Sequence, residues 1–211
     1  MRPLLRKTGL RFSLIALSAV LGVLVRFGNW DSYEVKYVVA LQQAALTANL
    51  MWFFQLYSHI GDSIVWIGVG LLLFAFYYRR PRKALKFGLF LVMVSIIVMA
   101  FRYILPRERP FMAFPSQVGA YAYEGLPSYP SGHVSPSAGG FYLIANHSRK
   151  LNVLFGAMIV LLGLSRVATG THYPTDIIGA ALFSYPIAAI IDGTKLFDRL
   201  KDRYNGRFGI G

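Results

Sequence analysis

The stretch Ser-Arg-Val-Ala-Thr-Gly-Thr-His-Tyr-Pro-Thr-Asp, residues 165–176, separates two apolar segments and holds an arginine, a histidine and an aspartate. Pro174 suits the first turn of a helix, so His172 and Asp176 are expected to lie close together where that helix begins. A carboxylate there can hold one imidazole nitrogen as N–H and leave the other free to attack an electrophile. Arg166 adds a permanent cation whose planar donors suit phosphate or carboxylate. The stretch therefore predicts a nucleophile, an orienting acid and an anion-binding group.

The composition indicates that this stretch belongs to a membrane protein. The 211 residues are 55% hydrophobic and 15% charged and include no cysteine. Apolar runs of about twenty residues recur, which is the length that crosses a bilayer core. The lack of cysteine excludes disulfides, thiolate catalysis and cysteine-ligated metal. The formal net charge of +13 could suit nucleic acid, but the positions of the charges favour a membrane instead, and we expect no nucleic-acid partner.

We expect an all-α integral membrane protein, a bundle of six transmembrane helices in a single domain over residues 1–211. The expected spans are residues 10–28, 64–78, 84–105, 132–148, 151–168 and 174–196. The first span could also be a signal peptide, but no convincing cleavage site follows it and further spans do, so we favour a retained helix. Residues 31–60 mix polar and aromatic side chains, which predicts one or two amphipathic helices at the membrane interface between the first two spans.

The distribution of basic residues predicts the orientation. Most of the 22 Lys and Arg residues fall before the first span, in the turns near residues 79–86 and 149–150, and after the last span. With both termini in the cytoplasm, these segments all lie inside, as the positive-inside rule requires. The basic residues left on the outer side are Arg26, Lys36, Arg102, Arg107, Arg109 and Arg166.

With six spans, one cluster of polar residues falls on the outer face. It consists of Arg102, Arg109, Ser131, Gly132, His133, Arg166, His172 and Asp176. Ionisable groups near membrane depth are costly and indicate function. Three arginines, with backbone N–H groups at the start of a helix, favour a phosphate ligand. One histidine can then attack phosphorus while the other protonates the leaving oxygen and later activates water. Arginines can neutralise the charge of the transition state, so we expect no metal and no cofactor.

Two other pairs of charged residues have ordinary structural interpretations. His59 and Asp62 are expected to pair at a helix end at the membrane surface. Arg107 and Glu108 are expected to form a solvated pair in the loop after the third span.

Three segments carry the cluster, and their spacing resembles that of a known family. They read Arg102-x6-Arg109-Pro110, Pro130-Ser131-Gly132-His133 and Ser165-Arg166-x5-His172-x3-Asp176. Together they resemble the signature of the type 2 phosphatidic-acid phosphatase superfamily, which also includes the vanadium haloperoxidases. Most members of that family have lysine where this chain has Arg102, a change that keeps the charge but alters the donor geometry.

The resemblance implies a role for each residue of the signature. His172 would be the nucleophile that forms a phosphohistidine, Asp176 would orient it, and His133 would protonate the leaving group. The implied phosphate-binding residues are Arg102, Arg109, Ser131, Gly132 and Arg166, with Ser165 and Pro130 in support.

The expected function is therefore hydrolysis of a lipid phosphate without metal. The short chain resembles the compact polyprenyl-diphosphate phosphatases of the superfamily. Phosphatidylglycerol phosphate, phosphatidate and lipid A phosphate are alternative substrates, and transfer to another lipid hydroxyl is an alternative reaction. A haloperoxidase would be soluble, and an anionic-lipid transporter is the alternative from another class. We expect the plasma (inner) membrane, an active site on its extracytoplasmic side, and membrane lipids as partners; the sequence leaves the oligomeric state open.

Overall fold

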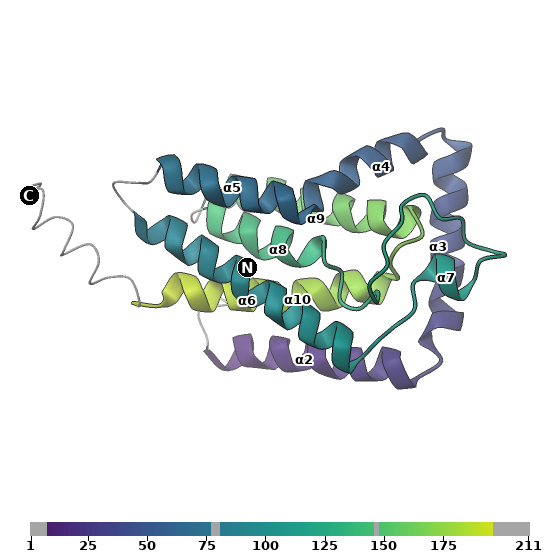
Figure 1. Ribbon diagram of the computed structural model, residues 1–211, viewed down its shortest axis with the longest axis horizontal. Helices are drawn as coiled ribbons and strands as arrows, with labels where there is room; N and C mark the ends of the chain where they lie inside the picture. Colours follow the sequence, from purple (N-terminus) through teal and green to yellow (C-terminus); the bar gives the residue numbers. More distant parts are fainter. Residues whose placement is uncertain (1–7, 77–80, 146–147, 196–211) are drawn as a thin grey trace, which may run out of the picture.

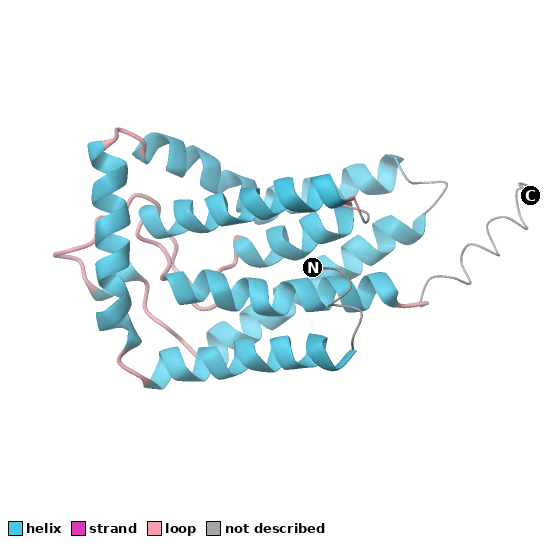
Figure 2. Ribbon diagram, turned by 180° about the vertical axis from the view of Figure 1, so that it is seen from behind, coloured by secondary structure: helices cyan, strands magenta, loops and turns pink. Residues whose placement is uncertain are grey.

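The computed structural model describes residues 8–76, 81–145 and 148–195, which form helices joined by loops (Figures 1 and 2). The helices are α2 (Thr8–Phe27), α3 (Trp30–Thr47), α4 (Met51–Ser58), the 3-10 helix η1 (His59–Gly61), α5 (Ser63–Phe76), α6 (Pro81–Ile104), α7 (Pro110–Ala113), α8 (Val134–Ile144), α9 (Arg149–Ala168) and α10 (Pro174–Gly193). The prediction of an all-α protein is confirmed for these residues. The basic segments at 1–7, 79–80 and 196–211, and the ends of three predicted spans at 77–78, 146–147 and 196, lie outside them.

Among the helices that the structure describes, four are long and apolar enough to cross a membrane: α2, α6, α9 and α10. A fifth candidate is α4 and η1 together with α5, a pair bent by 47°. The span predicted at residues 132–148 is instead the 11-residue helix α8, which at 1.5 Å per residue is about 16 Å long and shorter than a bilayer core of about 30 Å. The structure thus has four or five candidate spans, and the six-span bundle stays a prediction.

Helix α8 lies inside the bundle, and glycines on it admit large rings from its neighbours. A Cβ at Gly139 would lie 2.1 Å from the ring of Phe90 on α6, and one at Gly140 would lie 2.3 Å from the indole of Trp66 on α5. The indole Nε1–H of Trp66 also donates to Ser137 Oγ over 2.9 Å. Small residues in this helix therefore permit close packing against α5 and α6.

Helix α10 packs against α8 and α2, and Tyr129 closes the junction. A Cβ at Gly179 would lie 2.4 Å from Tyr129 Oη, so only glycine admits the phenol there. The phenol donates to the carbonyl oxygen of Ser18 on α2 over 2.5 Å, and Ser18 Oγ donates to the carbonyl oxygen of Gly179 over 2.9 Å. These contacts fix the loop before α8 against two candidate spans.

Helix α3 runs crosswise to the bundle helices at one end of the molecule (Figures 1 and 2). Its buried residues include Glu34, Val38 and Gln42, which lie four apart and therefore share one face. The amide nitrogen of Gln42 donates to the carbonyl oxygens of Gly119 and Ala168, over 2.9 and 3.1 Å. Polar contacts thus hold α3 to the loop after α7 and to the end of α9.

Helix α4 departs from the prediction that residues 31–60 lie along the interface. The chain breaks between α3 and α4 at Asn49, which has a positive φ of 53°, and bends again at Asp62, which is extended. Residues 51–61 and helix α5 together are long and apolar enough to form one bent span, so residues 51–61 belong to the helix bundle. Of residues 31–60, the part in α3 lies across the end of the bundle.

Candidate active site

Four chain segments meet at the end of the bundle that α3 covers: the end of α6, the start of α8, the end of α9 and the start of α10 (Figure 1). His172 lies in the loop between α9 and α10 and is fully buried. Its Nδ1 lies 3.3 Å from Asp176 Oδ2, as the four-residue spacing predicts. A carboxylate can only accept, so Nδ1 carries the proton and Nε2 keeps its lone pair. Arg109 Nη1 donates to that lone pair over 3.2 Å.

The surroundings keep His172 uncharged. Burial lowers its pKa well below the ordinary value, and the cations of Arg109 and Arg166 lower it further against the opposing effect of Asp176. Neutral imidazole is the form that can attack phosphorus. Both the orientation of the His172 ring and its neutral state therefore suit a nucleophile.

Several donors hold the Asp176 carboxylate. Its Oδ2 accepts from the backbone N–H of Tyr173 over 2.9 Å and from Ser128 Oγ over 2.6 Å. Its Oδ1 accepts from Arg107 Nη1 over 2.6 Å. The fixed carboxylate in turn fixes the imidazole of His172.

Arg107 corrects one prediction from the sequence. It was expected in a solvated pair with Glu108, but only 3% of it is exposed. Its guanidinium binds Asp31 and Glu34 of α3 over 2.8 and 2.6 Å. Burial alone would lower the pKa of Arg107, but Asp176, Glu34 and Asp31 raise it above its ordinary value. Sequence reasoning missed this role because the partners come from distant segments.

Three further arginines surround the space in front of His172: Arg102, Arg109 and Arg166, all buried. Arg109 donates to the carbonyl oxygens of Thr171 and Leu126, over 2.8 and 2.7 Å. Burial lowers the pKa of Arg109 to about 10, so it stays charged at neutral pH. Arg102 crosses the backbone at Gly132, where a Cβ would lie 2.7 Å from Nη2. Nε of Arg102 and Nε of Arg166 have no hydrogen-bond partner within the described chain and are free to bind an anion.

A carboxylate occupies the centre of this cationic group. Glu124, in the loop before α8, pairs with Arg166 Nη2 and, over 2.5 Å, with Arg109 Nη2. His133 Nδ1 lies 3.4 Å from Glu124 Oε1, and His172 Nε2 lies 4.0 Å from Oε2. The Glu124 carboxylate thus marks the position an anion takes between the two histidines. Sequence reasoning missed Glu124, because nothing in its irregular loop distinguished it.

His133 directly precedes α8 and faces the same space from the opposite side to His172. Its Nε2 lies 2.9 Å from Asp62 Oδ1. Asp62 also binds His59 Nδ1 over 2.7 Å, so the predicted pair of His59 and Asp62 exists but is not confined to the surface. Burial lowers the pKa of His133, Asp62 opposes this, and Arg109 and Arg102 lower it further; the net direction is down.

The remaining predicted residues differ in how closely they approach the centre. Ser131 lies beside Asp176: the backbone N–H of Ser131 donates to the backbone carbonyl oxygen of Asp176 over 3.2 Å. Pro130 is buried next to it. The hydroxyl of Ser165 donates to Leu162 within α9 over 2.7 Å, so the structure gives Ser165 a contact within its own helix.

The donor atoms of Glu124, His133 and His172 lie within 4.8 Å of one another, a spacing that could hold a metal ion. Arg109 and Arg166 already neutralise Glu124 there, and buried arginines repel a cation. The residues present therefore suit an anion better than a metal.

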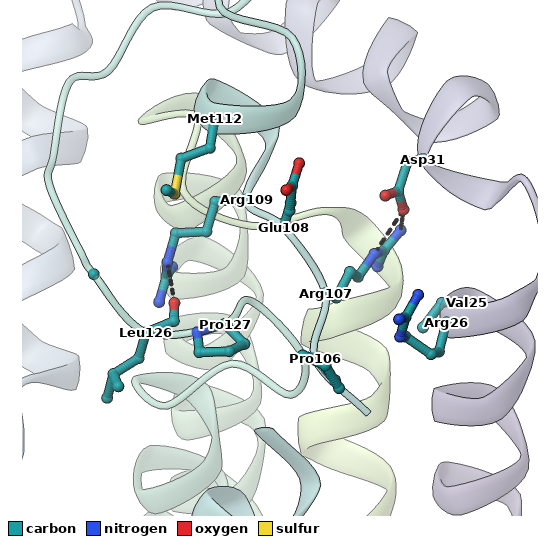
Figure 3. A pocket seen from close by; sticks show the side chains of 11 residues that line it. Val25, Arg26, Asp31, Pro106, Arg107, Glu108, Arg109, Met112, Leu126 and Pro127 are labelled. Carbon is teal, nitrogen blue, oxygen red and sulfur yellow. Dashed lines mark hydrogen bonds and ion pairs between the residues drawn. The ribbon is translucent and has the colours of Figure 1, made fainter. Parts of the chain in front are cut away.

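A cavity of about 490 Å³ adjoins this centre (Figure 3). Its walls are the end of α2, the loop from Pro106 to Arg109, Met112, and residues 125–127. Arg107 and Arg109 lie on different sides of it, and Arg109 reaches the Leu126 carbonyl oxygen across it (Figure 3). Arg109 therefore contacts both the cavity and His172.

Comparison with known proteins places this arrangement in a family. A model of the PAP2 superfamily matches residues 83–192, more than half of the 211 residues. The chain belongs to the PAP2 superfamily. It is 32% identical over 158 residues to an undecaprenyl-diphosphatase of Sulfolobus acidocaldarius, covering 71% of each chain. It is 27% identical to phosphatidylglycerophosphatase B of Bacillus subtilis, covering 66% of this chain and 74% of that one.

Two solved structures share the fold. A transmembrane PAP2-type phosphatidylglycerolphosphate phosphatase from Bacillus subtilis superposes with a TM-score of 0.72 at 20% identity, covering 90% of this chain and 96% of that one. LpxE from Aquifex aeolicus gives 0.61 at 18% identity, covering 77% and 96%. This PAP2 protein is an integral membrane phosphoric ester hydrolase. The matched segment 83–192 contains both histidines and the arginines but not Glu34 or Asp62.

Proposed function

We propose that this PAP2 protein hydrolyses a phosphate ester or diphosphate of a membrane lipid through a phosphohistidine, without a metal. One observation carries the proposal. The unprotonated Nε2 of the buried His172 faces a site where Arg109 and Arg166 hold a carboxylate. A phosphoryl group in place of that carboxylate would lie against the nucleophile and two cations.

The reaction follows in two steps. His172 Nε2 attacks phosphorus, the bond from phosphorus to the leaving oxygen breaks, and His133 gives that oxygen its proton. His133 then takes a proton from water, whose oxygen attacks phosphorus; the P–N bond to His172 Nε2 breaks, which frees inorganic phosphate and restores the neutral imidazole. Arg102, Arg109 and Arg166 balance the charge on the phosphoryl oxygens, and Asp176 balances the imidazolium that forms on His172.

A polyprenyl diphosphate of the undecaprenyl type is the proposed substrate. The Sulfolobus relative named for that activity is 32% identical to this chain, and the cavity beside Arg109 offers space for a second polar group. Phosphatidylglycerol phosphate is the second candidate, because of the Bacillus relative. Phosphatidate and lipid A phosphate, transfer to a lipid acceptor, and transport of an anionic lipid are the remaining alternatives.

The proposed setting is the plasma (inner) membrane, with both termini in the cytoplasm and the site on the extracytoplasmic side. The distribution of Lys and Arg along the chain supports this orientation. Cysteines introduced at exposed Glu108 and at exposed Lys150 test it, since a membrane-impermeant thiol reagent should label only the first in intact cells.

Phosphate release from purified protein in detergent with EDTA tests the function. Polyprenyl diphosphate, phosphatidylglycerol phosphate and phosphatidate are offered in parallel to the wild type, His172→Ala and the control Lys150→Gln, which removes an exposed charge at the start of α9, outside the site and the cavity beside it. Release that survives EDTA and Lys150→Gln but not His172→Ala supports the proposal, and the best substrate identifies the lipid. If the wild type releases nothing from any of them, hydrolysis is rejected, and lipid-acceptor labelling and liposome transport decide between transfer and transport.

A further inference from the structure

His133 lies between two carboxylates. Its Nδ1 faces Glu124 Oε1 at 3.4 Å, inside the proposed phosphate site, and its Nε2 faces Asp62 Oδ1 at 2.9 Å. Because an ionised carboxylate only accepts hydrogen bonds, Asp62 requires a proton on Nε2. The second ring nitrogen is then directed at the reacting group.

This arrangement repeats that of His172 from the other side. His172 also has one ring nitrogen on a carboxylate, Asp176, and the other towards Glu124. A carboxylate that holds a histidine in this way fixes the ring orientation and stabilises its protonated form. Asp62 therefore stands to His133 as Asp176 stands to His172.

The local chain is shaped for this contact. A Cβ at Gly61 would lie 2.5 Å from the Cβ of His133, so glycine is required next to Asp62. The 3-10 turn of η1 ends at Asp62, whose carbonyl oxygen accepts from Val65 and Trp66 at the start of α5. His59 Nδ1 binds the other oxygen of Asp62 over 2.7 Å, which leaves Oδ1 for His133.

We propose that Asp62 is the positioning residue of His133, holding the ring so that Nδ1 faces the leaving oxygen and favouring the protonated ring that donates to it. The inference rests on the proposed phosphatase function. In the first step the proton passes from His133 Nδ1 to the lipid oxygen as the P–O bond breaks, and Asp62 takes no proton. The charged groups facing His133 are Asp62 and Glu124, which favour its charged form, and Arg102 and Arg109, which oppose it.

The dependence on the leaving group tests this role. A good leaving group such as 4-nitrophenolate needs no protonation, whereas the alkoxide that leaves a lipid phosphate monoester such as phosphatidylglycerol phosphate or phosphatidate does. For Asp62→Asn we expect kcat/KM to fall about 10-fold to 100-fold on such a lipid monoester and less than about 3-fold on 4-nitrophenyl phosphate. Combining Asp62→Asn with His133→Ala should add little to the loss caused by His133→Ala alone, because both changes remove one function.

The pH profile gives a second measurement. The acid form of His133 is active, so activity falls as pH rises through its pKa. Removing the carboxylate lowers that pKa, and the basic limb of kcat/KM in Asp62→Asn should move to lower pH. The control Lys150→Gln, at the exposed start of α9, should leave the limb in place.

The outcomes separate the inference from the function on which it rests. If the wild type hydrolyses neither of these substrates nor polyprenyl diphosphate, the phosphatase function fails. If the wild type is active but Asp62→Asn loses both substrates equally, or neither, the positioning role is rejected. Thermal unfolding in detergent checks the fold; if Asp62→Asn does not fold, Asp62→Glu, which keeps the carboxylate, must retain the basic limb, and a shifted limb rejects the proposal.

Discussion

The two histidines sit in different surroundings on opposite sides of one site. His172 and its carboxylate are both fully buried, and Arg107 binds that carboxylate from behind. His133 is 17% exposed at its side chain and its partner Asp62 is 32% exposed. A nucleophile gains from a fixed, dry and uncharged ring, whereas a group that gives and takes protons needs a path to water. The difference in burial therefore matches the division of labour that we propose.

Replacing each histidine in turn tests the proposed difference in role directly and has the largest expected effect. His172→Ala should lower kcat/KM by about 10⁴-fold or more on every substrate, because it removes the attacking atom. His133→Ala should lower it by about 10²-fold on a lipid phosphate monoester, whose leaving group is an alkoxide, and much less on 4-nitrophenyl phosphate. Steady-state phosphate release measures both. An equal loss on the two substrates for His133→Ala would contradict the assigned roles.

Arg107→Ala tests how far the His172 side depends on its buried ion pairs. The change leaves Asp176, Glu34 and Asp31 without their shared cation, and stranding buried charges costs about 3–5 kcal/mol. We expect a lower thermal unfolding midpoint in detergent and at least about 10²-fold lower kcat. Lys150→Gln, on an exposed residue at the start of α9, should change neither. An unchanged midpoint in Arg107→Ala would show that the network contributes little.

The pH dependence sharpens the contrast between the rings. Both pKa values lie below the ordinary value of 6.5, that of His172 well below. Activity should rise as His172 loses its proton and fall as His133 loses its own, so kcat/KM should be greatest on the acidic side of 6.5. The two histidines bind protons more readily in the unfolded chain than in the folded protein. The free energy of unfolding should therefore fall as pH drops below 6.5. Rate profiles and unfolding midpoints at several pH values measure both effects.

Glu124→Gln addresses the space between the two rings and has the smallest expected effect. Glu124 competes with an incoming anion for Arg109 and Arg166. The neutral amide should compete less, so inhibition by vanadate or inorganic phosphate should strengthen by about 3-fold to 10-fold. Inhibition constants measured beside the wild type check this. Weaker inhibition would mean that Glu124 assists anion binding.

Much of the site could be predicted because its residues fall in short local patterns. The four-residue spacing of His172 and Asp176 and the Pro174 that starts α10 both act within one helix or turn. The four meeting segments followed from the order of the apolar runs. Local rules thus identified the helices and the cluster.

The rest could not be predicted, because it depends on contacts between distant segments. Glu34 reaches Thr175 across 141 positions, and Asp62 reaches His133 across 71. No periodicity in the sequence encodes such pairs. The short α8 was missed because residues 130–133 shape the site rather than continue the helix.

The contact between Glu34 and the start of α10 also bears on biosynthesis. Glu34 accepts from the backbone N–H of Thr175 over 2.9 Å and so caps the last helix with a residue of the second. The ribosome adds about 5–20 residues per second, so the interval between the synthesis of Glu34 and that of Thr175 is on the order of ten seconds. Until then the nucleophile's own carboxylate has not been made. The site therefore becomes complete only once residue 176 has been added, and a chain stalled just before α10 carries His172 and the arginines but lacks the carboxylate that orients the nucleophile.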